Sequence, residues 1–274
     1  GGVVNIITKR ASSPFSYSAF VEAGSFNTLR TGGNVSGREG ETDYSFSSSR
    51  IQTNGISKAD ENQGNTEDDG YDNYTLNGNM GTNLTEALRV EGSLRYAESR
   101  AEFDASGGVG GDGDLVAHTR DFQATGAIHL STFDGQLENS LSAAYAVVDR
   151  DNEFNGARSF SATGIRASLE YLGEIVISDQ WNAILGAKTE EAEVRGGASI
   201  RTDSVFSQVQ VLPLDGLSLI GGVRYDDHEA AGGVTTFRFT GAYSVEQTGT
   251  VFRGSWGEGF KSPTAFQLTF ACCG

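Results

Sequence analysis

Acidic residues crowd into two stretches of the chain, and carboxylates at this density could bind a metal ion. Residues 59–72 read ADENQGNTEDDGYD, and residues 98–114 read ESRAEFDASGGVGGDGD. Carboxylates on neighbouring loops repel one another unless a cation lies between them. Calcium is the ion that such hard, oxygen-rich sites suit. The sequence therefore indicates a candidate calcium site, with a solvated acidic loop as the alternative that composition alone favours.

Nucleotide binding and catalysis have weaker support. GVGGDG, residues 108–113, has the spacing of a nucleotide fingerprint, but that fingerprint needs a strand before it and a helix after it. Strands are predicted on both sides of this stretch. His118, His129 and His228 lie on separate segments, and the chain has neither G-x-S-x-G nor H-E-x-x-H. We therefore predict no catalytic residues and a protein that is not an enzyme.

The charge balance argues against one class of partner. The 274 residues include 36 Asp and Glu against 20 Lys and Arg, a net charge of −16, whereas nucleic-acid binding requires a basic surface. Adjacent residues rarely form a disulfide, so Cys272 and Cys273 provide no disulfide framework. A hydrophobic fraction of 37% fits strands that are apolar on one face alone.

The elements that must position these residues show a period of two. In EALRVEGSLRYAE, residues 86–98, apolar and polar side chains alternate, which is typical of a strand whose two faces meet different solvents. Residues 136–149, 217–226 and 235–246 repeat the pattern. About 13 such segments are present, and many are longer than the strands of soluble sheets. The predicted fold class is all-β.

The links between these segments alternate in length. Short turns are expected at 38–41, 83–86, 132–136, 212–216 and 246–249, and longer links at 53–72, 99–115 and 149–157. Transmembrane β-barrels collect short turns on the periplasmic side and long loops outside. The pattern therefore predicts an antiparallel up-and-down transmembrane β-barrel with neighbouring strands paired in chain order.

Two motifs resemble those of TonB-dependent outer-membrane receptors. GGVVNIITKR, residues 1–10, is similar to the strand that closes the plug domain in that family. GTVFRGSWGEGFKSPTAFQL, residues 249–268, resembles a barrel segment that rises into an extracellular loop. The second match rests on Arg253, Gly257, Gly259, Phe260, Lys261 and Pro263.

The resemblance implies a domain division and an incomplete barrel. Residues 1–10 would be the C-terminal strand of the plug, and residues 11–274 would be a partial barrel. Barrels of this family have about 22 strands. The roughly 13 alternating segments would then form about the first half of the barrel.

The resemblance also implies a function. Residues 66–76, TEDDGYDNYTL, resemble the acidic second loop of vitamin B12 transporters, and the region of Glu98 and Asp104 resembles its partner loop. The implied activity is transport across the bacterial outer membrane of a large, scarce metal chelate, cobalamin first and ferric siderophore second. The implied partners are the TonB–ExbB–ExbD complex, outer-membrane lipid with lipopolysaccharide, and the chelate. A passive porin-type channel is a further alternative, which a plug strand argues against.

The predicted hairpin gives the calcium site a position. Strands expected over 73–84 and 86–96 would set the bases of the two acidic links side by side. We therefore expect calcium to be held at the extracellular rim by Asp60, Glu67, Asp69, Glu98 and Asp104. The sequence identifies no residue that binds the transported molecule.

Overall fold

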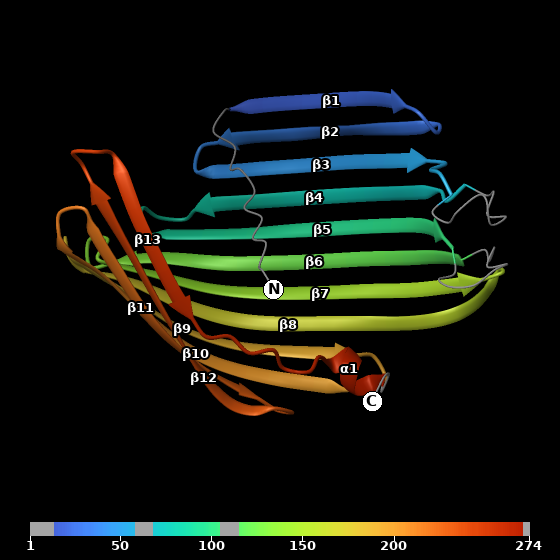
Figure 1. Cartoon of the computed structure of the whole chain (residues 1–274). Helices are drawn as coiled ribbons and strands as arrows, with labels where there is room; N and C mark the ends of the chain where they lie inside the picture. The colour runs from blue at the N-terminus through green and yellow to red at the C-terminus, as the bar shows by residue number, and fades with distance from the viewer. Residues whose placement is uncertain (1–13, 58–67, 105–114, 271–274) are drawn as a thin grey trace. The chain divides into compact units, whose positions relative to one another are not determined.

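The fold is a meander of thirteen antiparallel strands. A computed structural model describes residues 14–57, 68–104 and 115–270. The strands pair in chain order from β1 to β13 (Figure 1), which confirms the predicted order and number of strands. The predicted plug strand, residues 1–10, lies outside the described residues. The strands are β1 (Phe15–Gly24), β2 (Thr28–Glu39), β3 (Thr42–Thr53), β4 (Tyr71–Asn83), β5 (Leu88–Phe103), β6 (Leu115–Thr132), β7 (Leu137–Phe154), β8 (Ala157–Ser178), β9 (Trp181–Val194), β10 (Ser199–Leu214), β11 (Leu217–His228), β12 (Gly232–Val245) and β13 (Thr250–Gly257).

One predicted link is wrong. The stretch 149–157 was expected to be a long loop, but β7 continues to Phe154 and β8 begins at Ala157. Asn155 and Gly156 form the turn, with φ of 50° and 74°. Asn-Gly is the pair that tolerates left-handed backbone at both central turn positions. The expected links after β3 and β5 remain the long ones, since β4 begins at Tyr71 and β6 at Leu115.

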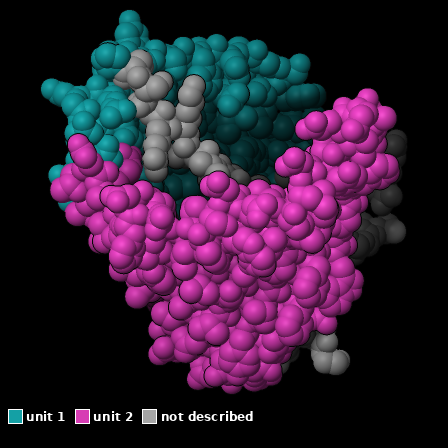
Figure 2. Space-filling model, turned by 90° about the vertical axis from the view of Figure 1, so that its left-hand side faces the viewer, with its two compact units in different colours: residues 1–84, 91–124, 146–163 teal, residues 85–90, 125–145, 164–274 magenta. Residues whose placement is uncertain are grey.

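The strands divide into two compact units (Figure 2). The first unit contains residues 1–84, 91–124 and 146–163, and the second contains residues 85–90, 125–145 and 164–274. Each unit is described separately below.

In the first unit, alternation along the strands produces one apolar face. The register pairs Tyr17 with Val35 and Val35 with Phe46, so these three side chains lie in one row on the same face. Strand residues i and i+2 also share a face. Val21 and Leu76 therefore extend the apolar surface along β1 and β4.

The opposite face of the first unit is polar. Ser18 Oγ donates to Asn34 Oδ1 at 2.9 Å, Asn77 Nδ2 donates to Ser47 Oγ at 3.3 Å, and Arg95 Nη1 donates to Asn77 Oδ1 at 3.1 Å. The register places Asn34 opposite Ser47. A row of hydrogen-bonding side chains therefore crosses β1 to β5.

The second unit shows the same division. Lys188 pairs with Ser204, and Ser204 pairs with Asp226, so a polar row crosses β9, β10 and β11. Val205 follows Ser204 in β10 and pairs with Tyr225, which precedes Asp226 in β11. Both side chains therefore lie on the other face. One face of each unit is therefore polar and the other apolar.

Large apolar side chains remain exposed on the apolar faces. The exposed fraction is 75% for Val21, 73% for Tyr17 and 55% for Trp256. Across residues 14–57, 68–104 and 115–270, the buried apolar side chains are those of Val116, Val194, Ile200 and Ala265. Sheet faces with so much exposed apolar surface are unfavourable in water and suit a lipid environment. No helix within those ranges combines the length and the apolar character needed to cross a bilayer.

A short helix, α1 (Ala265–Thr269), fastens the chain after β13 to the turn between β9 and β10 (Figure 1). A capping box at Thr264 begins the helix. The backbone N–H of Ala198 in the turn donates to Thr269 Oγ1 at 2.8 Å. A small apolar cluster supports the contact, formed by Val194, Ile200 and Ala265.

Candidate functional site

The bases of the two acidic links lie together in the first unit. The backbone N–H of Glu102, near the end of β5, donates to the carbonyl oxygen of Gly70 at 2.9 Å. The N–H of Gly70, just before β4, donates to Glu102 Oε2 at 2.8 Å. The predicted side-by-side placement of the link bases is therefore confirmed. Arg100 Nη1 donates to Glu102 Oε1 at 2.6 Å, so the Glu102 carboxylate already has a cationic partner.

A narrow neck joins the two described ends of the β3–β4 link. The N–H of Asp69 donates to the carbonyl oxygen of Ile56 at 3.4 Å, and Asp69 is only 4% exposed. Gly55 has a φ of 73°, and a Cβ at this position would lie 2.0 Å from the Asp69 carbonyl oxygen. The close backbone approach and the left-handed φ both require glycine.

The predicted calcium ligands have different surroundings. Both carboxylate oxygens of Asp104 are buried and accept no hydrogen bond from the described residues, which is costly for a carboxylate without a cation. Glu98 accepts a hydrogen bond from the Tyr96 hydroxyl at 2.9 Å and lies 3.6 Å from Arg120 Nε. Asp60 and Glu67 lie outside the described residues.

These ligands do not converge within the described parts of the chain. Residues 14–57, 68–104 and 115–270 contain no group of three or more His, Cys, Asp or Glu side chains that could hold a metal ion. Asp69, Glu98 and Asp104 remain candidate ligands, and Glu98 also lies within ion-pair distance of Arg120. The calcium site therefore stays a prediction, and any further ligands would have to come from the rest of the two links.

A polar hollow of about 860 Å³ adjoins the link bases in the first unit. Side chains of both charges line it, and Arg50 and Asp72 form an ion pair across β3 and β4. The other charged or aromatic lining residues include Tyr74, Arg100, Glu102 and His118. The hollow therefore presents charged groups of both signs beside aromatic rings.

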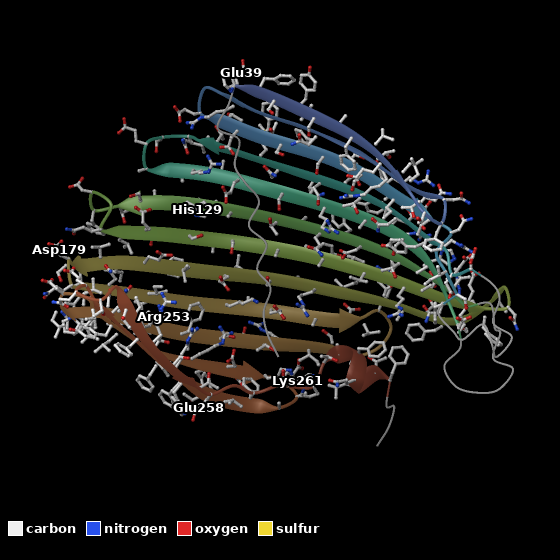
Figure 3. All side chains as sticks on the ribbon, turned by 45° about the horizontal axis from the view of Figure 1, so that its top comes forward. Glu39, His129, Asp179, Arg253, Glu258 and Lys261 are labelled. Carbon is white, nitrogen blue, oxygen red and sulfur yellow. The ribbon has the colours of Figure 1, made fainter. Side chains whose placement is uncertain are left out.

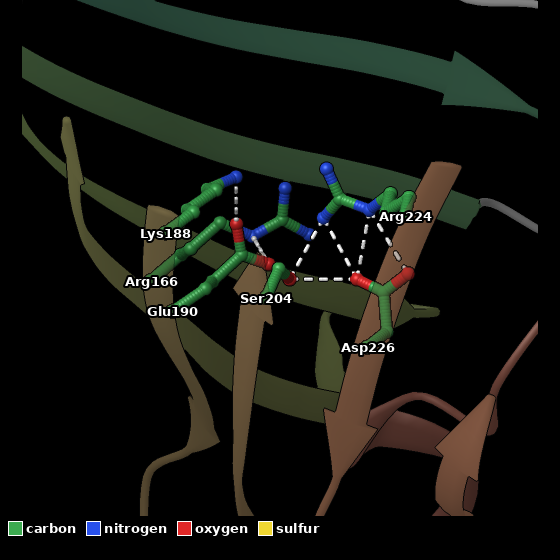
Figure 4. A network of polar contacts seen from close by, with 6 residues as sticks. All are labelled: Arg166, Lys188, Glu190, Ser204, Arg224 and Asp226. Carbon is green, nitrogen blue, oxygen red and sulfur yellow. Dashed lines mark hydrogen bonds and ion pairs between the residues drawn. The ribbon is translucent and has the colours of Figure 1, made fainter. Parts of the chain in front are cut away.

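A second polar group, which we call the β8–β11 cluster, lies in the second unit (Figure 4). It consists of Arg166, Lys188, Glu190, Ser204, Arg224 and Asp226. Arg224 Nε donates to both carboxylate oxygens of Asp226 at 2.9 Å, and Arg224 Nη2 donates to Ser204 Oγ at 2.8 Å. Ser204 Oγ donates in turn to Asp226 Oδ1 at 2.6 Å. This closed triangle of contacts fixes the guanidinium of Arg224.

The other half of the β8–β11 cluster centres on Glu190. Lys188 Nζ donates to Glu190 Oε2 at 2.8 Å, and Arg166 Nε lies 3.6 Å from Glu190 Oε1. The two arginines are more exposed than their partners: the side chain of Arg166 is 66% exposed against 27% for Glu190, and that of Arg224 is 40% exposed against 8% for Asp226. A solute on this face therefore meets guanidinium groups before it meets carboxylates.

An aromatic ring supports Arg224 from the neighbouring strand. The Arg224 guanidinium carbon lies 5.4 Å from the centroid of the Phe206 ring, a cation–π contact. The Phe206 ring in turn lies across Gly186, where a Cβ would come within 2.1 Å of the ring. Glycine at position 186 therefore makes room for the ring that orients Arg224.

The β8–β11 cluster was not predicted from the sequence, although a signal was present. Lys188 and Glu190, like Arg224 and Asp226, are opposite charges two residues apart within strands. In a strand that spacing places both side chains on one face. Such pairs identify charged positions on the polar face, but the pairing between strands had to come from the register.

The chain is similar to known outer-membrane receptors over nearly its whole length. Residues 14–271 match the family described as TonB dependent receptor-like, beta-barrel. The Vitamin B12 transporter BtuB of Vibrio vulnificus (strain CMCP6) is 22% identical over 98% of this chain and 45% of the relative. The chain thus spans less than half the length of this curated relative.

Solved structures show the same fold. The siderophore receptor PirA from Pseudomonas aeruginosa superposes with a TM-score of 0.75 and 17% identity, over 97% of this chain and 47% of that protein. The ferric enterobactin receptor PfeA from Pseudomonas aeruginosa superposes with a TM-score of 0.77 and 15% identity, over 98% of this chain and 47% of that protein. Together with the match over residues 14–271, the strand order and the two-faced strands show that the chain belongs to the family of TonB-dependent receptors, in their β-barrel domain.

Proposed function

We propose that this chain forms part of the barrel of an active transporter in the bacterial outer membrane. Its substrate would be a large, scarce metal chelate, cobalamin first and a ferric siderophore second. Energy would come from the TonB–ExbB–ExbD complex, and the protein would not act as an enzyme. The observation that carries the proposal is the family match over residues 14–271.

The two candidate substrates have different support. Cobalamin is favoured by the sequence similarity to a protein named as a vitamin B12 transporter. A ferric siderophore is favoured by fold similarity to proteins named as siderophore and ferric enterobactin receptors, at 17% identity or less. Because sequence similarity tracks substrate more closely than a shared fold does, cobalamin comes first.

The two-faced strands support a membrane location. Val21, Tyr17 and Trp256 lie on apolar faces and are more than half exposed. In a barrel that spans a lipid bilayer, such faces contact lipid and the alternate polar faces line the lumen. The apolar face would then meet outer-membrane lipid and lipopolysaccharide, and the β8–β11 cluster would face the lumen.

Uptake by whole cells tests the transport proposal. The full-length receptor, expressed in cells without a cobalamin receptor of their own, should restore accumulation of radiolabelled cyanocobalamin when TonB is present and not when TonB is absent. Ferric enterobactin, offered to matched cells without a siderophore receptor, is the comparison substrate. TonB-dependent uptake of ferric enterobactin, without uptake of cyanocobalamin, would make a ferric siderophore the substrate in place of cobalamin. Uptake that persists without TonB would support a passive porin.

Calcium at the β3–β4 and β5–β6 links is part of the same proposal. Asp104 supplies two buried oxygens without donors among the described residues, and Asp69 lies at the buried neck of the other link. These two residues would hold the ion, together with Asp60, Glu67 and Glu98. Bound calcium would neutralise the carboxylates and order two links that are otherwise strongly acidic.

Calorimetry on the full-length receptor tests the calcium site. Asp69→Ala combined with Asp104→Ala should weaken calcium binding at least tenfold, because both substitutions remove carboxylate ligands. Glu39→Ala combined with Asp179→Ala removes the same charge at the β2–β3 and β8–β9 turns (Figure 3) and should leave calcium affinity unchanged. Equal affinity in the two double variants, or no calcium binding by the wild type, would end the calcium hypothesis.

A further inference from the structure

Two arginines lie near each other on the polar face of the second unit. Arg224 in β11 pairs with Thr236 in β12, and Arg238 in β12 pairs with Gly222 in β11. The two arginines are therefore diagonal neighbours on the same face, with Cβ atoms somewhat less than about 7–8 Å apart. Long side chains reach across such a diagonal, so both guanidinium groups can contact one ligand.

The two arginines differ in how they are held. Arg224 is fixed by Asp226 and Ser204, each only 5% exposed, and by the ring of Phe206. These contacts use Nε and Nη2 of Arg224, and in Figure 4 the remaining terminal nitrogen points away from Asp226. Arg224 is thus already ordered, with one terminal nitrogen left to bind a ligand.

Arg238 has no such partner. It is exposed and forms no ion pair or side-chain hydrogen bond within the described parts of the chain. Glu258, the residue after β13, accepts a hydrogen bond through Oε2 from the backbone N–H of Phe237 at 3.1 Å. Asp226 lies behind Arg224 and is buried. Within this neighbourhood the accessible charge is positive, although the chain as a whole carries −16.

We propose that Arg224 and Arg238 form a binding site for an oxyanion, the carboxylate or phosphate group of a solute. The free guanidinium fork of Arg238 matches the two oxygens of either group, and Arg224 would add a hydrogen bond through its remaining terminal nitrogen. Such charged hydrogen bonds are stronger than neutral ones. Asp226, Ser204 and Phe206 act as positioning residues for Arg224. The proposal rests on the proposed function only in placing this polar face toward the lumen.

Residue-resolved arginine modification tests the site without knowledge of the transported molecule. The full-length receptor is treated with phenylglyoxal, and each arginine's rate of modification is measured by mass spectrometry. Citrate serves as the carboxylate probe and inorganic phosphate as the phosphate probe, each against sodium chloride at equal ionic strength. Either probe should slow modification of Arg224 and Arg238 at least threefold, with the same half-saturating concentration for both residues.

Arg253 provides an internal control. It lies on the same face, opposite Ala242, which is four residues along β12 from Arg238 (Figure 3). It is not a member of the β8–β11 cluster. Either probe should change the rate at which phenylglyoxal modifies Arg253 by less than half. The variant Asp226→Asn, and the milder Ser204→Ala, should raise the half-saturating concentration several-fold at both arginines, because each loosens Arg224.

Four results would overturn the site. The first two are that neither probe protects the two arginines, or that Arg253 is protected equally. The third is that Arg224 and Arg238 have different half-saturating concentrations. The fourth is that phenylglyoxal does not modify the two arginines even when no anion is present. Protection by one probe alone supports the site and identifies the class of oxyanion. Because labelling requires no transport, a receptor that fails the uptake experiment can still pass this one, and the reverse also holds.

Discussion

Gly186→Ala is expected to destabilise the folded receptor by about 1–3 kcal/mol, the usual cost of overpacking. A Cβ at position 186 would lie 2.1 Å from the Phe206 ring, so the ring must leave its place. Displacing the ring also removes the aromatic face beneath Arg224. The measurement is the urea midpoint of the full-length receptor, read from the gel migration of unheated samples.

Gly164→Ala is the matched control for this prediction. Gly164 also lies in a strand of the second unit, at the pairing between β8 and β9, and a Cβ there would meet nothing within 4 Å. The stability of the Gly164→Ala receptor should be unchanged or slightly higher, because alanine loses less backbone entropy than glycine when a strand forms. Gly186→Ala combined with Phe206→Leu should recover most of the loss. Equal midpoints for the two single alanine variants would contradict the role of the Phe206 ring.

Gly55→Ala should open the neck of the β3–β4 link. The substitution places Cβ 2.0 Å from the Asp69 carbonyl oxygen, and that oxygen belongs to backbone that cannot turn aside as a side chain can. The left-handed φ of 73° adds roughly 1–2 kcal/mol for a residue with a side chain. The Asp69 amide should exchange its hydrogen more than tenfold faster, which corresponds to about 1.4 kcal/mol. Hydrogen exchange on the full-length receptor, read by mass spectrometry, measures this effect.

Gly156→Ala separates the clash from the backbone strain. Gly156 has a φ of 74°, almost the same as Gly55, but a Cβ there would meet nothing within 4 Å. The Gly156→Ala substitution should therefore speed hydrogen exchange only around the β7–β8 turn. The increase should reflect the cost of the left-handed backbone alone. If the two variants increased local exchange equally, the contact between Gly55 and Asp69 would have no special role.

The strands could be predicted from the sequence because one physical pattern dominates it. Alternation in residues 86–98 predicted a strand that the structure places at Leu88–Phe103. The failure at 149–157 has the opposite cause. Beyond the apolar part of β7, polar residues such as Arg150 and Asp151 occupy both faces, so the alternation is lost while the strand continues to Phe154. The Asn155–Gly156 turn signal was the better guide there.

The candidate sites were less accessible to sequence reasoning. The neighbouring link bases followed from the hairpin between β4 and β5, which is local in sequence. The ion pair between Glu98 and Arg120 could not be seen, because it depends on the register between β5 and β6. Likewise, Asp226 contacts Ser204 from 22 residues away. Such partners become visible only when the pairing of the strands is known.

The chain-order pairing of the strands has a consequence for how the sheet forms. Every strand finds its partners next to itself in sequence, so the contact order is low for an all-β protein and most loop closures cost little entropy. The exceptions are the steps from β3 to β4 and from β5 to β6. Closing the link 54–70 costs roughly 2 kcal/mol more than closing the Asn155–Gly156 turn, by the logarithmic dependence on length. The meander can therefore form as three runs of tight-turn hairpins, β1–β3, β4–β5 and β6–β13, which the two long links then join.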